Sequence, residues 1–288
     1  MQTICGTWQL SPSDGFWNEA NALESEKIIT KAVHLGLKRF DCAQGYGNGL
    51  SEQILGKVLS RYSSTSFLVD TKIMPSSKDV ASLLETSLRR LKTDHVNTLY
   101  IHWPSSKLPW QKMLCDMEKL KEQGKISKIG ICNLTLPELK NLCREVKPDV
   151  FQRPLSLIWS REWKETLSFC KEKNIECVTY SPLGMGTLVK NGISDRRKDL
   201  FCYKEPCSDA FNAIKNQLSG PEEALLWVKA QEPDCLILGS SCADQLEANV
   251  KSLEKELSRE RNRILTDLAD ALSCKSEAIC DNIFSYRY

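Results

Sequence analysis

Short apolar runs alternate with amphipathic helical patterns along the whole chain, and this alternation limits the fold more than any other feature. Strands that alternate with helices imply a parallel sheet, and continuous apolar runs are typical of strands covered by helices on their outer face. Eight strand-and-helix units in about 250 residues are the number that closes a (β/α)8 barrel, also called a TIM barrel. The predicted strands cover residues 3–10, 37–43, 67–72, 96–103, 126–133, 149–153, 175–183 and 235–241. We therefore predict an α/β fold, with one barrel domain over residues 1–288.

The helical patterns between these runs have recognisable starts and stops. Ser25 is the expected N-cap of the first helix and Ser51 that of the second, while Pro137 and Pro221 open two later ones. The predicted helices cover residues 26–35, 52–61, 78–91, 110–122, 137 onward, 161–173, 209–217, 221 onward, 244–253 and 258–272. Residues 184–208 form the longest predicted loop, and long loops in compact domains are usually lids or disordered segments.

Composition excludes several classes of partner. The net charge is only +2, so no electrostatic argument favours nucleic acid or an anionic membrane. The 13 cysteines are scattered through predicted helices and strands of a large chain, and no apolar run reaches the length of a membrane span. We expect reduced thiols, a cytoplasmic location and a monomer or weak oligomer. With 3 histidines and no Cys-x2-Cys pair, we expect no metal.

The stretch Arg39–Glu52 carries the first chemical signal. Asp41 ends a predicted strand, and Tyr46 follows in a glycine-rich loop whose backbone can bring the phenol close to a ligand. A carboxylate and a phenol at one corner suit proton transfer, although this short pattern is also common in ordinary turns.

Polar residues stand at the carboxyl ends of the other predicted strands as well, where barrel enzymes carry their chemistry. Packing explains each of them singly, but it does not explain why all of them occupy the same rim. They are Lys72, His102, Asn133, Gln152, Tyr180, Ser181, Gly239, Ser240 and Ser241.

In these positions the sequence resembles the aldo-keto reductase family over nearly its whole length. The matching pieces are Gly6–Trp8, Asp41–Glu52, Thr71–Lys72, Tyr100–Pro104, Gly130–Asn133, Gln152, Tyr180–Gly184 and Gly239–Asn249. The resemblance implies reduction of an aldehyde or ketone to an alcohol, or the reverse, with NADP(H) as cofactor and NAD(H) as an alternative. The expected partner is a small-molecule carbonyl substrate.

By this resemblance Asp41, Tyr46, Lys72 and His102 form a catalytic tetrad. A phenol has a pKa of about 10, and a neighbouring ammonium favours the phenolate, so we expect Lys72 to lower the pKa of Tyr46. Asp41 would orient Lys72, and His102 would direct the carbonyl oxygen by a hydrogen bond. The alternatives are a structural Lys72–Asp41 ion pair and a core histidine. Trp8, Tyr46, His102 and Trp103 are the implied substrate contacts.

The resemblance also implies a set of cofactor contacts. Asn133 and Gln152 match the residues that bind the nicotinamide carboxamide, Tyr180 matches the aromatic that stacks on the nicotinamide ring, and Ser181 and Leu183 match pyrophosphate contacts. The remaining implied contacts are Gly6, Thr7, Trp8, Asp41, Cys132, Gly239, Ser240, Ser241, Gln245 and Asn249.

Several positions depart from the family pattern. Cys132 stands where many members have Ser, and Arg153 introduces a charge beside Gln152. Gln245 and Gly239 replace basic residues that other members use for the 2′-phosphate, which removes a bidentate partner. Lys190, Arg196 or Arg197 in the long loop are the candidate replacements, and that loop and the C-terminal tail are the expected source of substrate specificity.

The sequence starts almost at the first predicted strand, whereas family members usually have an N-terminal hairpin that covers the barrel floor. We therefore expect that something else covers the floor, or that it stays open.

The sequence leaves two other functional classes to compare with a reductase. A regulatory or sensor protein that binds NADP(H) on the same fold is the main alternative, and the complete tetrad favours the enzyme over it. A barrel hydrolase or lyase is disfavoured because paired carboxylates and metal ligands are missing from the strand ends.

Overall fold

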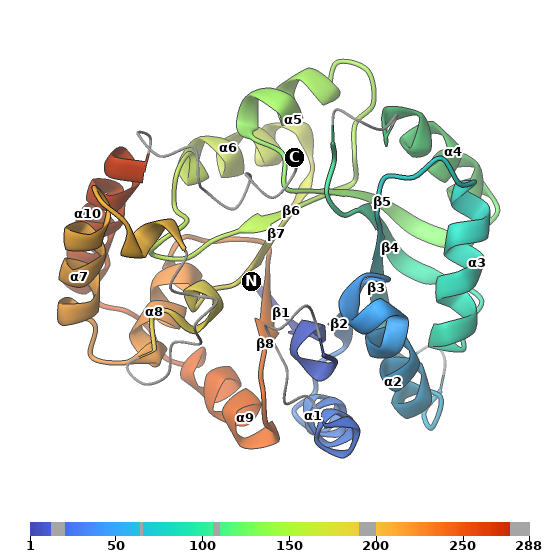
Figure 1. Ribbon diagram of the computed structural model, residues 1–288, viewed down its shortest axis with the longest axis horizontal. Coiled ribbons are helices and arrows are strands. Elements are labelled where there is room, and N and C mark those ends of the chain that lie inside the picture. Colours follow the sequence, from blue (N-terminus) through green and yellow to red (C-terminus); the bar gives the residue numbers. More distant parts are fainter. Residues whose placement is uncertain (13–20, 64–65, 106–109, 190–199, 277–288) are drawn as a thin grey trace.

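Eight parallel strands close into a barrel in the computed structural model, which describes residues 1–12, 21–63, 66–105, 110–189 and 200–276 (Figure 1). Each strand pairs with the next in sequence, and the last pairs with the first, in the register Ile4 with Ile237. The strands are β1 (Gln2–Gly6), β2 (Arg39–Asp41), β3 (Leu68–Ile73), β4 (Val96–Ile101), β5 (Ile126–Cys132), β6 (Val150–Pro154), β7 (Glu176–Tyr180) and β8 (Cys235–Gly239). The predicted (β/α)8 fold is therefore confirmed, while the domain limits 1–288 stay a prediction.

Helices ring the barrel and cover its outer face (Figure 1). They are α1 (Ala22–His34), α2 (Leu50–Leu59), α3 (Val80–Leu91), α4 (Trp110–Glu122), α5 (Leu136–Leu142), α6 (Trp163–Lys173), α7 (Ser208–Gln217), α8 (Pro221–Ala230), α9 (Ala243–Ser252) and α10 (Arg259–Ser276). Their apolar stripes are buried against the strands, as Leu84, Leu88 and Leu91 of α3 illustrate. No helix within the described ranges has both the length and the apolar character needed to cross a membrane.

Two predicted helix caps are wrong. Asn21, not Ser25, caps α1, since its side chain accepts a hydrogen bond from the Leu23 amide. Ser25 lies inside the helix and donates its hydroxyl to the carbonyl of Leu10 at 2.8 Å. Likewise Gly49 precedes α2 with φ of 89°, while Ser51 is buried and donates to the carbonyl of Thr7. Both hydroxyls bind another segment of the chain, which a local capping pattern does not reveal.

Several predicted strands are shorter than expected, and β1 and β7 differ most at their carboxyl ends. β1 stops at Gly6, and Trp8–Leu10 form a 3-10 turn. β7 stops at Tyr180, because Ser181 takes a left-handed backbone conformation with φ of 55°. The chain therefore turns over the rim one to a few residues earlier than the apolar pattern suggests. In the predicted 184–208 loop, Gly184–Gly186 and Phe201–Tyr203 form 3-10 turns. Lys190, Arg196 and Arg197 lie outside the described residues, as does the C-terminal tail.

Inward-facing side chains stack in layers inside the barrel, as alternation along each strand requires. The middle layer is apolar and fully packed. It consists mainly of Ile4, Tyr100, Cys132, Val150, Val178 and Ile237. On β1, β6 and β7 this layer lies between the rim at the carboxyl ends of the strands and the floor at their amino ends, whereas on β2 and β3 Arg39 and Asp70 of the floor are only two residues from Asp41 and Lys72 of the rim.

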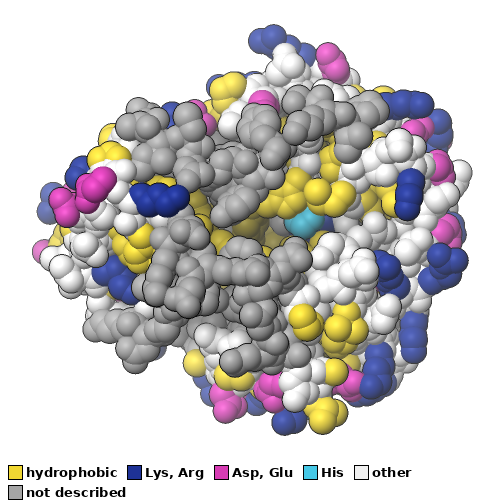
Figure 2. Space-filling model, in the orientation of Figure 1, with side chains coloured by type: hydrophobic (Ala, Val, Ile, Leu, Met, Phe, Trp, Pro, Cys, Tyr) yellow, Lys and Arg dark blue, Asp and Glu magenta, His cyan; other side chains and the backbone are white. Residues whose placement is uncertain are grey.

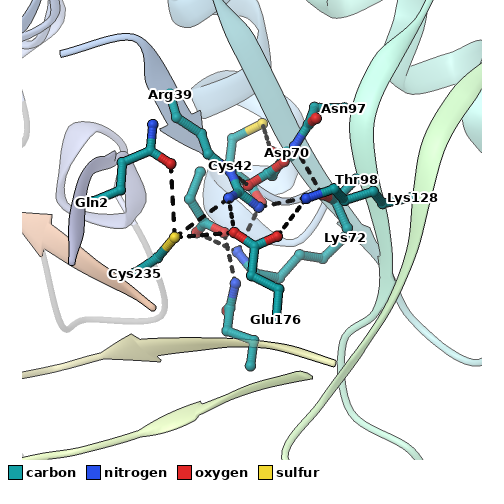
Figure 3. Close-up of polar contacts among 12 residues, drawn as sticks. Gln2, Arg39, Cys42, Asp70, Lys72, Asn97, Thr98, Lys128, Glu176 and Cys235 are labelled. Atoms are coloured by element: carbon teal, nitrogen blue, oxygen red, sulfur yellow. Dashed lines mark hydrogen bonds and ion pairs between the residues drawn. The ribbon is translucent and has the colours of Figure 1, made fainter. Parts of the chain in front are cut away.

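A network of charged side chains fills the floor of the barrel, at the amino ends of the strands (Figure 3). The Arg39 guanidinium, 2% exposed, donates to Asp70 at 2.7 Å and to Glu176 at 2.5 Å. Lys128 and the Cys235 thiol also donate to Glu176, at 2.6 and 3.0 Å. Burial disfavours the Glu176 carboxylate, but Lys128 and Arg39 outweigh burial and lower its pKa to about 2. Side chains from five strands, β2, β3, β5, β7 and β8, therefore fill this end of the barrel.

Replacing Arg39 with Met should lower the free energy of unfolding by about 3–5 kcal/mol, because Asp70 would remain buried without its cationic partner. Urea denaturation followed by far-UV circular dichroism measures this loss. Lys128→Met is the matched control: Lys128 is 40% exposed, so its ion pair should contribute no more than about 1 kcal/mol. Equal losses in the two variants would contradict the assignment of Arg39 as the main ion of the floor.

Candidate active site

A cavity of about 650 Å³ opens at the carboxyl ends of the strands. Figure 2 shows the corresponding hollow, where hydrophobic side chains gather around a histidine. Its walls combine aromatic and aliphatic side chains with a few polar groups, the usual composition of a small-molecule site. The polar and aromatic walls come from the ends of β1, β2, β4, β6, β7 and β8 and from the residues that follow these strands.

The Lys72 ammonium is the best-fixed group at the cavity base. Its Nζ donates to Asp41 Oδ1 at 2.5 Å, to the carbonyl of Cys42 at 2.9 Å and to Tyr46 Oη at 3.2 Å. An ammonium has three protons, so these acceptors use all of them. The side chain is fully buried, and Asp41 supplies the opposite charge that such a position requires. Although burial opposes the charge, Asp41 raises the pKa of Lys72 and keeps it protonated.

The Tyr46 phenol accepts a hydrogen bond from Lys72, so its own hydroxyl proton can be directed into the cavity. Burial raises the pKa of Tyr46 above its ordinary value, and Lys72 offsets only part of this effect. The sequence-based expectation has the right sign for the Lys72 contribution but is wrong for the net shift. The reason is that desolvation of the phenolate exceeds the stabilisation by one ammonium, which Asp41 already neutralises.

The loop that presents Tyr46 depends on an unusual backbone. Gly47 has φ of 55°, and a Cβ there would lie 2.5 Å from Ser11, so only glycine fits without displacement. Gln44 fastens the loop to α3 through the carbonyl of Leu83 at 2.6 Å and the hydroxyl of Ser87 at 2.9 Å. These contacts hold the phenol against the end of β3 with little freedom.

His102 stands beside the phenol, immediately after β4. Its ring centroid lies 5.7 Å from that of Tyr46, in an edge-on arrangement. Burial and, to a smaller extent, the Lys72 charge hold the pKa of His102 well below its ordinary value. The imidazole is therefore neutral near pH 7 and can donate one hydrogen bond to a ligand oxygen.

Gln152 and Tyr180 form the next wall, and Asn133 supports it from behind. Asn133 has a left-handed backbone with φ of 60°, which turns its side chain toward neighbouring strands. Its Nδ2 donates to the carbonyl of His102 at 3.0 Å, and its Oδ1 accepts from the Tyr180 hydroxyl at 2.6 Å. Gln152 Nε2 donates to Asp41 Oδ2 at 2.9 Å, which leaves its Oε1 without a hydrogen bond recorded in the described structure. The Tyr180 ring is thus held in one orientation at the cavity wall.

Two departures from the family pattern have different positions. Arg153 faces away from the cavity, since its guanidinium donates to Thr166 at 2.8 Å and to the carbonyl of Arg161 at 2.8 Å. The side chain after Gln152 points to the opposite side of the strand, so the guanidinium stays outside the cavity, although its charge still acts on the Tyr180 phenol behind the wall. Cys132 faces the barrel interior in the apolar middle layer, and burial raises its pKa.

The far end of the cavity lies over the junction of β8 and α9. Ser240 Oγ and Asn249 Nδ2 are buried there with no hydrogen-bond partner in the described part of the structure. Buried polar atoms are rarely left unsatisfied, so this end suits a polar ligand. Gln245 accepts hydrogen bonds from the amide and the hydroxyl of Ser241 at 2.9 and 3.2 Å.

Most of the site residues predicted from sequence line this one cavity. They are Gly6, Thr7, Trp8, Asp41, Tyr46, His102, Trp103, Gln152, Tyr180, Ser181, Leu183, Gly239, Ser240, Ser241, Gln245 and Asn249. Lys72, Cys132 and Asn133 lie behind the lining, and Lys72 reaches it through Tyr46. Sequence reasoning missed the lining residues Gln9, Met74, Met185 and Val189. Gln9 and Met185 carried a positional signal, since they directly follow the Gly6–Trp8 and Tyr180–Gly184 motifs.

Comparisons with known proteins agree on one family. The model of the aldo/keto reductase family matches residues 3–270. A methylglyoxal reductase of Escherichia coli strain K12 is 26% identical, over 88% of this chain and 85% of its own. An NADH-specific methylglyoxal reductase of the same strain is 23% identical, over 93% and 94%. Among solved structures, an aldo-keto reductase from Klebsiella pneumoniae in complex with NADPH has a TM-score of 0.74 at 22% identity, over 93% and 90%.

Proposed function

Because the chain belongs to the aldo/keto reductase family, we propose that it reduces an aldehyde or ketone to an alcohol with a nicotinamide dinucleotide. The observation that carries this proposal is the Lys72–Tyr46 contact of 3.2 Å at the base of the cavity. Through this contact, a fixed positive charge lies next to the proton donor. A carbonyl oxygen bound beside Tyr46 would also lie beside His102.

The residues along the cavity fit the dinucleotide. The unpartnered Ser240 Oγ and Asn249 Nδ2 supply polar contacts at one end, and the Tyr180 ring offers a flat surface near the other. Gln152 Oε1 and the second amide proton of Asn133 would hold the carboxamide. NADP(H) or NAD(H), when bound, supplies the hydride.

The side chains at the base of the cavity supply the proton, stabilise the charge and orient the carbonyl oxygen. As hydride reaches the carbonyl carbon, its oxygen gains negative charge, and Tyr46 donates the proton that completes the alcohol. Lys72 stabilises the phenolate left on Tyr46, and Asp41 keeps Lys72 charged and aligned. Neutral His102 donates a hydrogen bond to the same oxygen and orients it. Burial raises the pKa of the phenol, so it stays protonated at neutral pH, as reduction requires.

The substrate end of the cavity is lined by aromatic and apolar side chains. Trp8 lies 6.1 Å from Tyr46 and Trp103 lies 5.8 Å from His102, measured between ring centroids. Met74 adds a flexible apolar surface. We therefore propose a small-molecule carbonyl substrate, and the names of two relatives make methylglyoxal a first compound to test.

A panel of aldehydes, ketones and sugars, with methylglyoxal included, tests the function. Oxidation of NADPH and NADH is followed by absorbance, and at least one carbonyl should turn over with kcat on the order of 1 s⁻¹ or higher. Reactions without carbonyl give the background rate. Tight dinucleotide binding without turnover of any compound would instead favour a regulatory or sensor protein on this fold.

A further inference from the structure

Charge at the far end of the cavity bears on which dinucleotide binds. This inference rests on the proposed function. Since the reacting groups lie at Tyr46 and His102, the nicotinamide belongs at that end. The adenosine half must then extend along the cavity to the β8–α9 junction. Loops after the last two strands and a following helix start are also where barrels commonly bind phosphate. The unpartnered, buried Ser240 Oγ and Asn249 Nδ2 independently indicate a polar ligand there.

The start of α9 is already occupied by oxygen atoms of the chain itself. The amide of Ala243, the first residue of α9, donates to Glu24 Oε1 of α1 at 3.3 Å. The Ser241 amide donates to Gln245 Oε1. A helix start attracts anions through its free amides and its dipole. Here a carboxylate takes one of these amides, and a side-chain amide oxygen takes another.

In the described part of the chain, few positive charges lie around the same junction. The cavity lining contains no Lys or Arg among the residues that the structure describes. Nearby cations on α1 and α9 are paired with carboxylates: Lys27 with Glu24 at 3.2 Å, and Lys31 with Glu247 at 2.7 Å. Asp244 adds another acidic group in the first turn of α9. Glu24 is not one of the cavity-lining residues, but it binds the first amide of α9, so a phosphate ester that approached this helix start would meet a carboxylate, whereas a ribose hydroxyl would meet a hydrogen-bond acceptor.

We propose that Glu24 is a cofactor-specificity residue, which opposes the 2′-phosphate of NADPH and accepts a hydrogen bond from the 2′-hydroxyl of NADH. The cavity therefore takes both dinucleotides with similar affinity. An acidic residue that contacts the ribose 2′-hydroxyl performs the same selection in the unrelated dinucleotide-binding sheet fold. In the present barrel the carboxylate comes from α1, far from the β8–α9 junction in sequence.

Binding of NADH and NADPH, measured without substrate, tests the proposal. Trp8 and Trp103 line the cavity, so quenching of tryptophan fluorescence reports occupancy, and calorimetry gives an independent Kd. In the unsubstituted protein the two Kd values should agree within about tenfold. In Glu24→Gln the Kd of NADPH should fall about tenfold, because a repulsive charge is removed, while that of NADH changes less than about threefold.

Glu26→Gln is the matched control. Glu26 is also an ion-paired carboxylate of α1, but it faces Lys57 and Arg61 rather than α9. Its loss should leave the ratio of the two Kd values unchanged. An unchanged ratio in Glu24→Gln, or NADPH bound more than about a hundredfold tighter than NADH by the unsubstituted protein, would overturn this inference alone. Failure of both dinucleotides to bind would overturn the proposed function and this inference with it.

Discussion

Tyr46→Phe should lower kcat for carbonyl reduction by at least about a thousandfold, while the Kd of the dinucleotide changes less than about twofold. The substitution removes only the hydroxyl, which is the group in contact with Lys72 at 3.2 Å. The ring that packs near Trp8 and His102 remains, so the cavity keeps its shape. Steady-state kinetics on the best carbonyl of the panel and a fluorescence titration with the dinucleotide measure the two quantities.

Tyr62→Phe is the control for Tyr46→Phe. Tyr62 packs edge-on against Phe67, and it is not part of the cavity lining. It should retain full turnover. If Tyr46→Phe also turned over at the original rate, Tyr46 could not be the proton donor, and the mechanism would have to be abandoned.

Lys72→Met should reduce kcat at least as much as His102→Ala, and we expect about a thousandfold or more for each. Methionine keeps a similar length but removes the charge that stabilises the phenolate. His102→Ala removes one hydrogen-bond donor and leaves the proton donor intact. Single-turnover rates with bound dinucleotide compare the two variants without interference from product release.

A loss of folding must be separated from a loss of catalysis in Lys72→Met, because Asp41 would be left buried without its partner. The double variant Lys72→Met, Asp41→Asn removes both charges and should recover much of the melting temperature, but none of the activity. Recovery of activity in the double variant, or a larger loss in His102→Ala than in Lys72→Met, would contradict the role given to Lys72.

The barrel and its rim were predictable because both follow from repeating local patterns. Each apolar run followed by a helix fixes one unit, and parallel strands bring all their carboxyl ends to one side. That is why Asp41 and Tyr46 could be placed around one cavity with His102, which is distant from both in sequence. The helix caps were less predictable, since Ser25 and Ser51 bind carbonyls of Leu10 and Thr7 that no local pattern identifies.

Other properties of the site depend on the completed fold. The net shift in the pKa of Tyr46 reflects its burial, which a sequence does not report, and so its direction was predicted wrongly. Arg153 directly follows Gln152 in sequence, yet strand alternation turns its guanidinium toward Thr166 and out of the cavity. Met74, Met185 and Val189 line the cavity through shape alone, and their side chains carry no chemical signature.

The apolar middle layer has a practical consequence for altering this protein. At Ile4, Val150 and Val178 it separates the ionic network around Arg39 from the substrate end of the cavity, whereas on β2 and β3 that network directly adjoins Asp41 and Lys72. Distant sites without shared partners usually contribute additively to stability. Substitutions of Trp8, Trp103 or Met74 that accommodate new compounds should therefore leave the stability contributed by the Arg39 network unchanged.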